Sequence, residues 1–192
     1  MKKPKTRPAA APAPAFPELR SASDRRVLEL FASRALERTL RSGGKTNLEA
    51  VWQQTSKELQ ARAPAGKRPS PGPLDVHRRI VSGLPGIALV IASAMAFDSM
   101  QEALPLFDLS PKTAKQRLWQ TLAPNEGEIA LRIGRVLTFA ADALGSLDAA
   151  RQYLRTPNFA LGGVAPRDLL RTAEGEQIVL AEIQAQAEGG PV

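Results

Sequence analysis

The side chains that most often carry catalysis are scarce in this sequence. The chain of 192 residues contains one histidine, His77, and no cysteine. A nucleophile–histidine–carboxylate arrangement or a thiolate metal site therefore lacks the residues to build it. His77 stands beside two arginines in LDVHRRI, where a helix-surface residue is expected rather than a general base. We predict no enzyme activity, no cofactor and no metal site.

The segment DSMQEALPLFDLSPKTAKQRLWQ, residues 98–120, suggests binding chemistry instead. It predicts a short helix over 99–106, a turn over 107–109 and a second helix over 111–120, with Ser110 as N-cap and Pro111 at the first helical position. This is the outline of a helix-turn-helix. Its second helix offers side chains suited to phosphates and to base edges in the major groove. They are Lys112, Thr113, Lys115, Gln116 and Arg117.

Two features weigh on this interpretation in opposite directions. No acidic residue lies between Asp108 and Glu126, which favours contact with an anion. Pro105, however, falls inside the first helix and departs from the motif. A surface helix with three basic residues can also be a solvated face, so the pattern alone leaves both interpretations open.

Positive charge is concentrated in the front part of the chain. The formal net charge is +7; residues 1–80 contain 17 Lys and Arg against 7 Asp and Glu, whereas residues 81–192 contain 9 against 12. A basic N-terminal segment attracts nucleic acid by neutralising phosphates, although many such segments serve only solubility.

Helices are the only regular elements that the hydrophobic pattern predicts. Residues 1–20, rich in Pro and Ala, are expected to be disordered or polyproline II. Residues 21–62 predict a helical hairpin, with helices over 23–44 and 46–62, and residues 63–73 predict a linker. The remainder shows no strand alternation and eight candidate helices, so the expected fold class is all-α, a helical bundle with an N-terminal helical extension.

The apolar run GLPGIALVIASAMAF, residues 83–97, is too short for a bilayer span of about 20 residues and predicts a buried helix. Prolines interrupt the basic N-terminus where a signal peptide needs a continuous apolar stretch. The expected location is the cytoplasm, with no membrane partner.

The segment TPNFALGGVAPRDLL, residues 156–170, is apolar yet interrupted by prolines and by the pair Gly162-Gly163. Glycine lets the backbone approach another surface, and Phe159, Leu161 and Val164 are side chains of the kind that anchor interfaces. The segment is either a docking surface or an internal connection whose apolar residues seal the core.

The stretch from Val136 to Gly190 resembles the toxin-binding domain of the Xre/MbcA/ParS antitoxin family. The matching positions are Leu144-Gly145, Tyr153-Leu154, Pro157-Asn158, Leu161-Gly162-Gly163, Pro166, Leu169-Leu170, Thr172, Gly175, Val179 and Ile183. RIVSGLP, LSPKTAKQRL and LAPNEGEIALRIGRV resemble the family more weakly. Departures are Tyr153 where Trp is usual, Gly127 where Ser is frequent, and Gln116-Arg117 where two arginines often stand. Residues 1–73 lie outside the resemblance.

The resemblance implies an antitoxin of a type II toxin–antitoxin system. Such a protein sterically neutralises a cognate RES-domain toxin that consumes NAD, and represses its own operon by binding operator DNA as a homodimer within a hetero-oligomeric complex. Residues 74–122 would form an Xre-like helix-turn-helix and residues 123–192 the toxin-binding domain. The residues implied to contact toxin are Asn158, Phe159, Leu161, Gly162, Gly163, Pro166, Arg171, Gln184, Gly189 and Gly190.

Two further expectations follow. The proline-rich linker predicts that the front segment is separable, so that a chain starting at Leu74 folds alone. The final residues QAQAEGGPV are expected to be a flexible tail. The alternative function is a stand-alone helix-turn-helix transcriptional regulator without a toxin partner, and an enzyme ranks below both.

Overall fold

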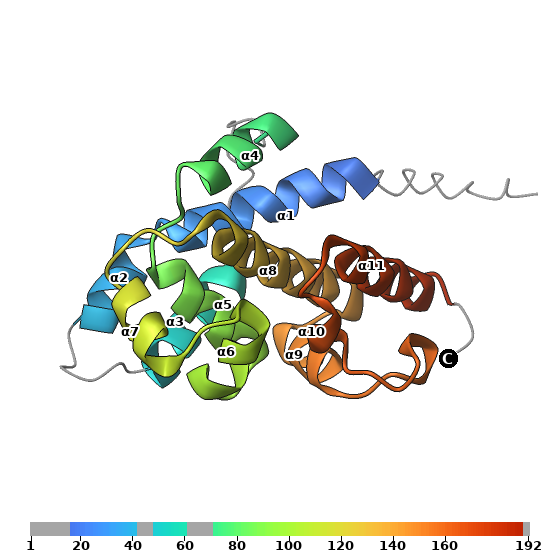
Figure 1. The fold of residues 1–192 in the computed structure, drawn as a ribbon. Coiled ribbons are helices and arrows are strands. Elements are labelled where there is room, and N and C mark those ends of the chain that lie inside the picture. Colours follow the sequence, from blue (N-terminus) through green and yellow to red (C-terminus); the bar gives the residue numbers. More distant parts are fainter. Residues whose placement is uncertain (1–15, 42–47, 61–70, 190–192) are drawn as a thin grey trace, which may run out of the picture.

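Every regular element is a helix in the part of the chain that the computed structural model describes, residues 16–41, 48–60 and 71–189 (Figure 1). The all-α prediction is confirmed. Two isolated β-bridges, Pro85–Thr121 and Asn158–Val164, join loop segments. The helices are α1 (Phe16–Phe31), α2 (Arg34–Arg41), α3 (Leu48–Gln60), α4 (Pro73–Val81), α5 (Ile87–Ala96), α6 (Met100–Phe107), α7 (Pro111–Arg117), α8 (Pro124–Leu144), α9 (Leu147–Arg155), the 3-10 turn η1 (Phe159–Leu161), α10 (Pro166–Leu169) and α11 (Ala173–Ala187).

Two buried helices, α5 and α8, form the centre of the molecule. All ten residues of α5 are buried, and its one polar side chain, Ser93, donates its hydroxyl proton to the carbonyl of Leu89 at 2.7 Å. The helix α8 is buried from Ile129 to Thr138. Helices α1, α9 and α11 pack on α8, and α3 packs on α5 (Figure 1). The buried helix predicted for residues 83–97 is therefore confirmed.

Within the described ranges, no helix by itself is long and apolar enough to cross a membrane. The two helices α5 and α6 pass that test only as a pair, and the chain bends by 111° between them.

The N-terminal region differs from the predicted hairpin in two respects. Helix α1 begins at Phe16, inside the segment expected to lack structure. The single helix predicted over 23–44 is divided into α1 and α2. The break lies at Ser33, whose hydroxyl accepts a hydrogen bond from the backbone N–H of Leu36 at 3.4 Å. Serine capping of this kind starts a new helix, which gives the physical reason for the division.

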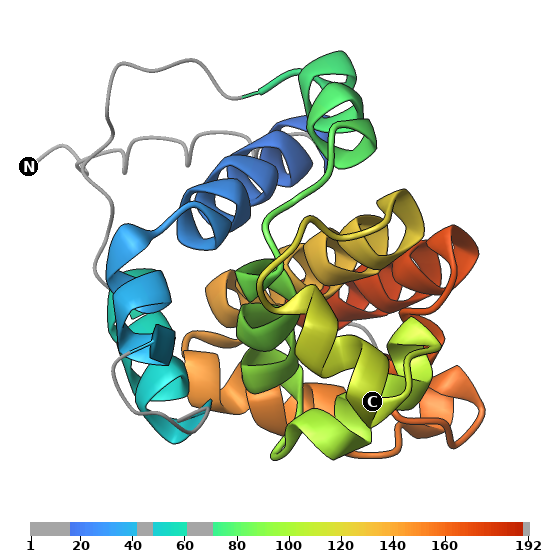
Figure 2. The same ribbon diagram turned by 60° about the vertical axis from the view of Figure 1, so that its left-hand side comes forward.

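Helix α1 belongs to the main core instead of forming a separable extension. Helix α1 runs beside α8 (Figure 2). Val27 is fully buried, and a Cβ added to Gly134 in α8 would lie 2.5 Å from Val27 Cγ1, so the two helices touch only because residue 134 is glycine. Leu36, Leu40 and Val51 of α2 and α3 join the same hydrophobic cluster. This packing argues against the expectation that a chain starting at Leu74 folds alone.

Candidate functional site

The two-helix outline predicted around Ser110 is present, and its turn is built by two residues. Asp108 ends α6 in the left-handed conformation, with φ of 55°. Ser110 caps α7 by accepting a hydrogen bond from the N–H of Thr113 at 3.1 Å. Helix α7 ends at Arg117, which is earlier than the predicted end at Gln120.

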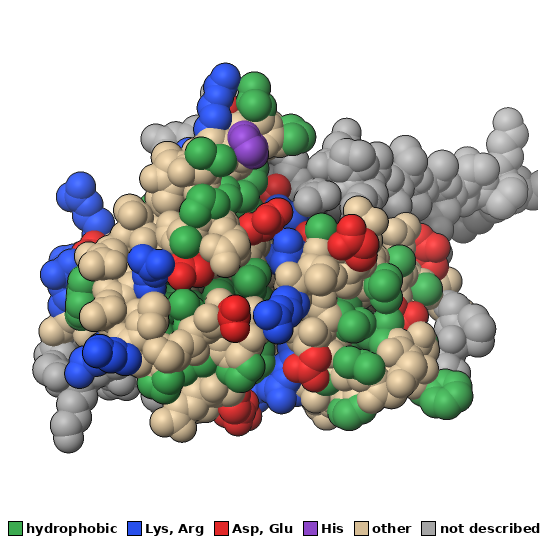
Figure 3. All heavy atoms as spheres, in the orientation of Figure 1, with side chains coloured by type: hydrophobic (Ala, Val, Ile, Leu, Met, Phe, Trp, Pro, Cys, Tyr) green, Lys and Arg blue, Asp and Glu red, His purple; other side chains and the backbone are tan. Residues whose placement is uncertain are grey.

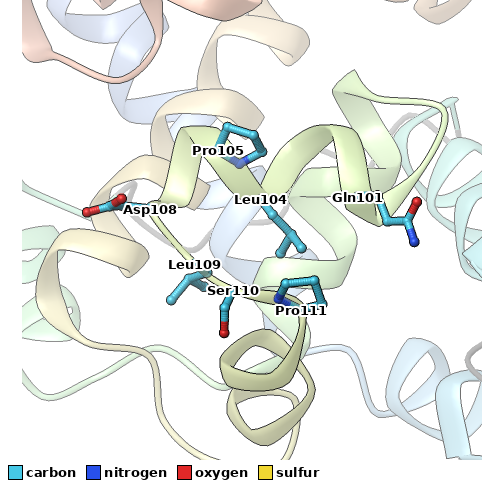
Figure 4. Close-up of a pocket in the computed structure, with 7 residues that line it drawn as sticks. All are labelled: Gln101, Leu104, Pro105, Asp108, Leu109, Ser110 and Pro111. Atoms are coloured by element: carbon cyan, nitrogen blue, oxygen red, sulfur yellow. The ribbon is translucent and has the colours of Figure 1, made fainter.

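Pro105 does not interrupt α6, which continues to Phe107. A shallow hollow of about 530 Å³ opens between the end of α6 and the start of α7, and Figure 4 shows its lining. The lining residues are Gln101, Leu104, Pro105, Asp108, Leu109, Ser110 and Pro111. Asp108 is the one ionisable group among them, so the hollow lacks the pair of groups that acid–base catalysis requires.

The five residues predicted to contact DNA fall into two groups. Lys112, Lys115 and Gln116 are exposed. Thr113 is half-buried, and its hydroxyl lies 2.9 Å from that of Ser110. The Nε of Arg117 lies 3.0 Å from Oε1 of Glu126. Thr113 and Arg117 are thus engaged within the protein.

Glu126 is an acidic neighbour that the sequence argument missed. Its side chain is only 4% exposed, and Oε2 accepts a hydrogen bond from the N–H of Ala123 at 2.8 Å. The carboxylate therefore fixes the first turn of α8 and holds Arg117 at the end of α7. The signal was available, because Ala-Pro-Asn-Glu places an acid at the third position of a helix that begins with proline.

A second candidate surface is formed by the loop between α9 and α10. Asn158 organises this loop: its side-chain oxygen accepts from the N–H of Ala160 at 2.9 Å, and its backbone carbonyl accepts from the N–H of Gly163 at 2.9 Å. Gly162 and Gly163 have φ of 73° and 79°, a region that residues with a side chain rarely adopt. The backbone N–H of Asn158 also donates to the carbonyl of Val164 at 3.1 Å. The loop is therefore a defined turn.

The tip of this turn is apolar and open to solvent. Phe159 is 97% exposed, the largest exposure among the large apolar residues that the structure describes, and Val164 is 39% exposed. Ile178 on α11, which the sequence analysis did not single out, is 51% exposed. Figure 3 shows hydrophobic side chains on this face, over α11 and the loop beneath it. Leu161 is half-buried and packs on the core, so it seals the turn from inside.

The exposed turn is tied to α11. The side-chain amide of Asn158 donates to Glu182 Oε1 at 3.4 Å. Ile178 lies one helical turn before Glu182, on the same side of α11. Burial raises the pKa of Tyr153 to about 12, the negative charge of Glu182 adds to the rise, and Asn158 opposes it. The Tyr153 hydroxyl is therefore protonated at neutral pH beneath the turn.

The other predicted toxin contacts are spread around this face. Pro166 is buried at the first position of α10, so its part is structural. Arg171, Gln184 and Gly189 are exposed, and Gly190 lies outside the described residues. The tail expected to be flexible from Gln184 is helical to Ala187, because Ile183 is buried and Gln184 donates to Glu188 at 2.9 Å.

A buried group of four charges holds this region to the rest of the protein. Arg135 of α8 contacts Asp24 of α1 at 2.6 Å and also hydrogen-bonds Glu176 of α11. Arg132 Nε lies 3.5 Å from the same glutamate, and its Nη1 donates to the carbonyl of Leu170 at 2.9 Å. Burial opposes the charged form of Arg135, but the two carboxylates outweigh it, so the pKa of Arg135 is raised. Two arginines inside the apolar helix of LRIGRVL were the sequence signal for this group.

Comparison with protein families gives a match to one segment, which contains the turn, Tyr153 and α11. Residues 139–189 match the model of the antitoxin Xre/MbcA/ParS C-terminal toxin-binding domain. The resemblance stated for residues 136–190 is thereby confirmed. Comparison with curated proteins gives no match.

The matched segment comprises the end of α8, α9, η1, α10 and α11. Its large exposed apolar side chains are those of Phe159, Val164 and Ile178, and its buried side faces the core through Leu154, Leu170 and Ile183. The segment from α1 to α7 lies outside the match.

Proposed function

We propose that this protein is the antitoxin of a type II toxin–antitoxin system and that the turn at Phe159 is part of the surface that binds the toxin. One observation carries the proposal: the toxin-binding domain match covers a rigid turn that presents a phenylalanine almost completely to solvent. A side chain exposed to water in this way contributes little to folding, whereas its burial against a partner contributes about 1.5–3 kcal/mol to binding. Aromatic anchors of this kind dominate many interfaces.

The proposed toxin is a RES-domain protein that consumes NAD, as the resemblance implies, and the proposed inhibition is steric. The exposed residues Arg171, Gln184 and Gly189 would line the rim of the interface. Such an antitoxin acts by binding alone and requires no cofactor.

The proposal also includes autoregulation. Lys112, Lys115 and Gln116 on α7 would contact operator DNA, while Arg117 and Thr113 hold α7 in place through Glu126 and Ser110. A homodimer in the cytoplasm would present two α7 helices to a two-fold symmetric operator.

The test is co-expression of the full chain with the product of the adjacent reading frame, followed by purification through a tag on the toxin. We expect a stable complex, and we expect purified antitoxin to stop NAD consumption by the toxin at stoichiometric concentration. A neighbouring product that neither binds the chain nor consumes NAD would contradict the toxin proposal.

The alternative is a stand-alone regulator that keeps DNA binding without a toxin. The observation that favours it is the pair of exposed, unpaired lysines on α7 within the described part of the chain. Operator binding by the purified chain, together with a neighbouring product that forms no complex with it, would support this alternative.

A further inference from the structure

We infer that helix α2, in the segment that no family match covers, forms a phosphate-binding surface with α7 on duplex DNA. The inference rests on the proposed DNA binding by α7 and extends it to a second element. It begins with Arg34, Arg38 and Arg41, whose spacing of four and three residues places them on one side of α2. All three are exposed, and over this length α2 spans about 10 Å.

Arg41 joins this arginine row to the segment that follows α7. The guanidinium carbon of Arg41 lies 4.6 Å from the centroid of the Trp119 ring, within the range of a cation–π interaction. Trp119 lies two residues beyond the end of α7 and is 53% exposed. Lys112 and Lys115, three residues apart, lie on one side of α7. The arginine row of α2 therefore meets the segment that follows α7 at Arg41 and Trp119.

The charge of this surface is left largely uncompensated by the described residues. Arg41 pairs with Glu37 at 2.7 Å, but neither Arg34 nor Arg38 is ion-paired with any residue in the described ranges. Lys112 and Lys115 likewise form no ion pair with a residue in the described ranges. Figure 3 shows Lys and Arg side chains at the end of the molecule formed by α2 and α7, on the left of the view.

Duplex DNA is the partner that this arrangement fits. A recognition helix in the major groove, about 12 Å wide, brings flanking elements to the phosphate backbone at the groove edge. Arginine is the side chain best suited to bind phosphate through paired hydrogen bonds. Arg34 and Arg38 would hold phosphates beside the groove that α7 enters. Such contacts set orientation and affinity without reading sequence.

The experiment uses the full-length chain and two duplexes of roughly 30 base pairs, three helical turns. One is the DNA directly upstream of the coding sequence, and the other is its scrambled counterpart. Dissociation constants are measured by fluorescence anisotropy from 50 to 300 mM salt for the wild type, R34Q/R38Q, K112Q/K115Q and the control R78Q/R79Q. The control removes two charges from exposed residues of α4, outside α2 and α7.

We expect R34Q/R38Q to reduce the slope of log K against log salt by about two units, and to weaken binding by about 10- to 60-fold at 0.1 M salt on both duplexes. The control should change neither quantity comparably. A circular dichroism melt equal to that of the wild type shows that the variant is folded.

The other outcomes overturn the inference in distinguishable ways. Loss of binding in K112Q/K115Q with wild-type binding in R34Q/R38Q removes α2 from the surface and leaves the proposed function of α7 intact. An equal loss of DNA affinity in R78Q/R79Q would mean that the effect of R34Q/R38Q comes from the change in net charge and not from the position of α2. Unchanged DNA binding with a weakened toxin complex makes the arginine row a protein interface. A wild-type chain that binds neither duplex eliminates both this inference and the proposed operator binding.

Discussion

Phe159 is the residue whose position is hardest to explain by folding alone. It is 97% exposed, while the neighbours that shape its turn, Asn158 and Leu161, are half-buried. Its removal should therefore leave the folded state almost unchanged, which separates binding from stability.

Replacing Phe159 by Ala should weaken the complex with the toxin by about 2 kcal/mol, which is roughly 30-fold in Kd. The free energy of unfolding should change by no more than about 0.5 kcal/mol, because the side chain is exposed. Isothermal titration calorimetry and chemical denaturation give the two quantities. Leu74→Ala, which removes a side chain 59% exposed on α4, is the matched control. Equal toxin affinity in wild type and Phe159→Ala would remove Phe159 from the interface.

Gly162 acts first on its own turn. A Cβ on this residue would meet nothing within 4 Å, but φ of 73° disfavours any side chain. We expect Gly162→Ala to cost about 1 kcal/mol of stability, and Gly162→Asn to cost less because asparagine tolerates this conformation. Thermal melts of the two variants test the order. If Gly162→Ala and Gly162→Asn both melt at the temperature of the wild type, the left-handed backbone conformation does not explain the glycine at this position.

At the scale of elements, the charged group around Arg135 joins three helices that are distant in sequence. Asp24, Arg135 and Glu176 come from α1, α8 and α11, and all are nearly excluded from solvent. Their attraction has to offset the loss of hydration, so the group stabilises the fold only while it is complete. It connects the N-terminal segment to the helix that carries Ile178.

Arg135→Met should therefore destabilise the protein by about 3–5 kcal/mol, because Asp24 and Glu176 each lose a buried ion pair. Urea denaturation monitored by circular dichroism measures the loss. The matched control is Arg26→Met, which breaks the exposed pair Arg26–Asp142 between α1 and α8, with side chains 37% and 60% exposed. Its expected cost is below about 1 kcal/mol. A similar loss of the free energy of unfolding in both variants would mean that burial does not determine how much this charged group contributes to stability.

At the scale of the protein, the N-terminal helices complete the core against which the segment matched by the toxin-binding family packs. Val27 and Phe31 of α1, Leu36 of α2 and Val51 of α3 are essentially inaccessible to solvent. Their removal would expose the sides of α5 and α8 that they cover. The N-terminal segment is consequently part of the folding unit even though it lies outside the family match.

A chain that begins at Leu74 should lose cooperative unfolding and aggregate, because an apolar surface of α5 and α8 becomes exposed. A chain that begins at Phe16 retains α1 and should melt like the full-length protein. Calorimetry and size-exclusion chromatography compare the two. A soluble Leu74 chain with a sharp melt would show that the C-terminal part folds independently.

Features that depend on neighbouring residues were predictable along the chain. Serine followed by proline predicted the start of α7, and the apolar run 83–97 predicted α5. The spacing of residues from Leu144 to Ile183 predicted the resemblance to the toxin-binding domain family that the comparison found. Capping, apolar periodicity and turn preference act over a few residues, so they can be read directly along the chain.

Which of those residues are free to bind depends on tertiary packing and was not predictable along the chain. The engagement of Arg117 by Glu126, the burial of Pro166, the exposure of Phe159 and the approach of α2 to α7 all depend on how the helices pack. The partner of Asp24 is Arg135, 111 residues away. An apolar or charged side chain looks the same in the sequence whether it faces the core or the solvent, because burial is a property of packing between distant segments.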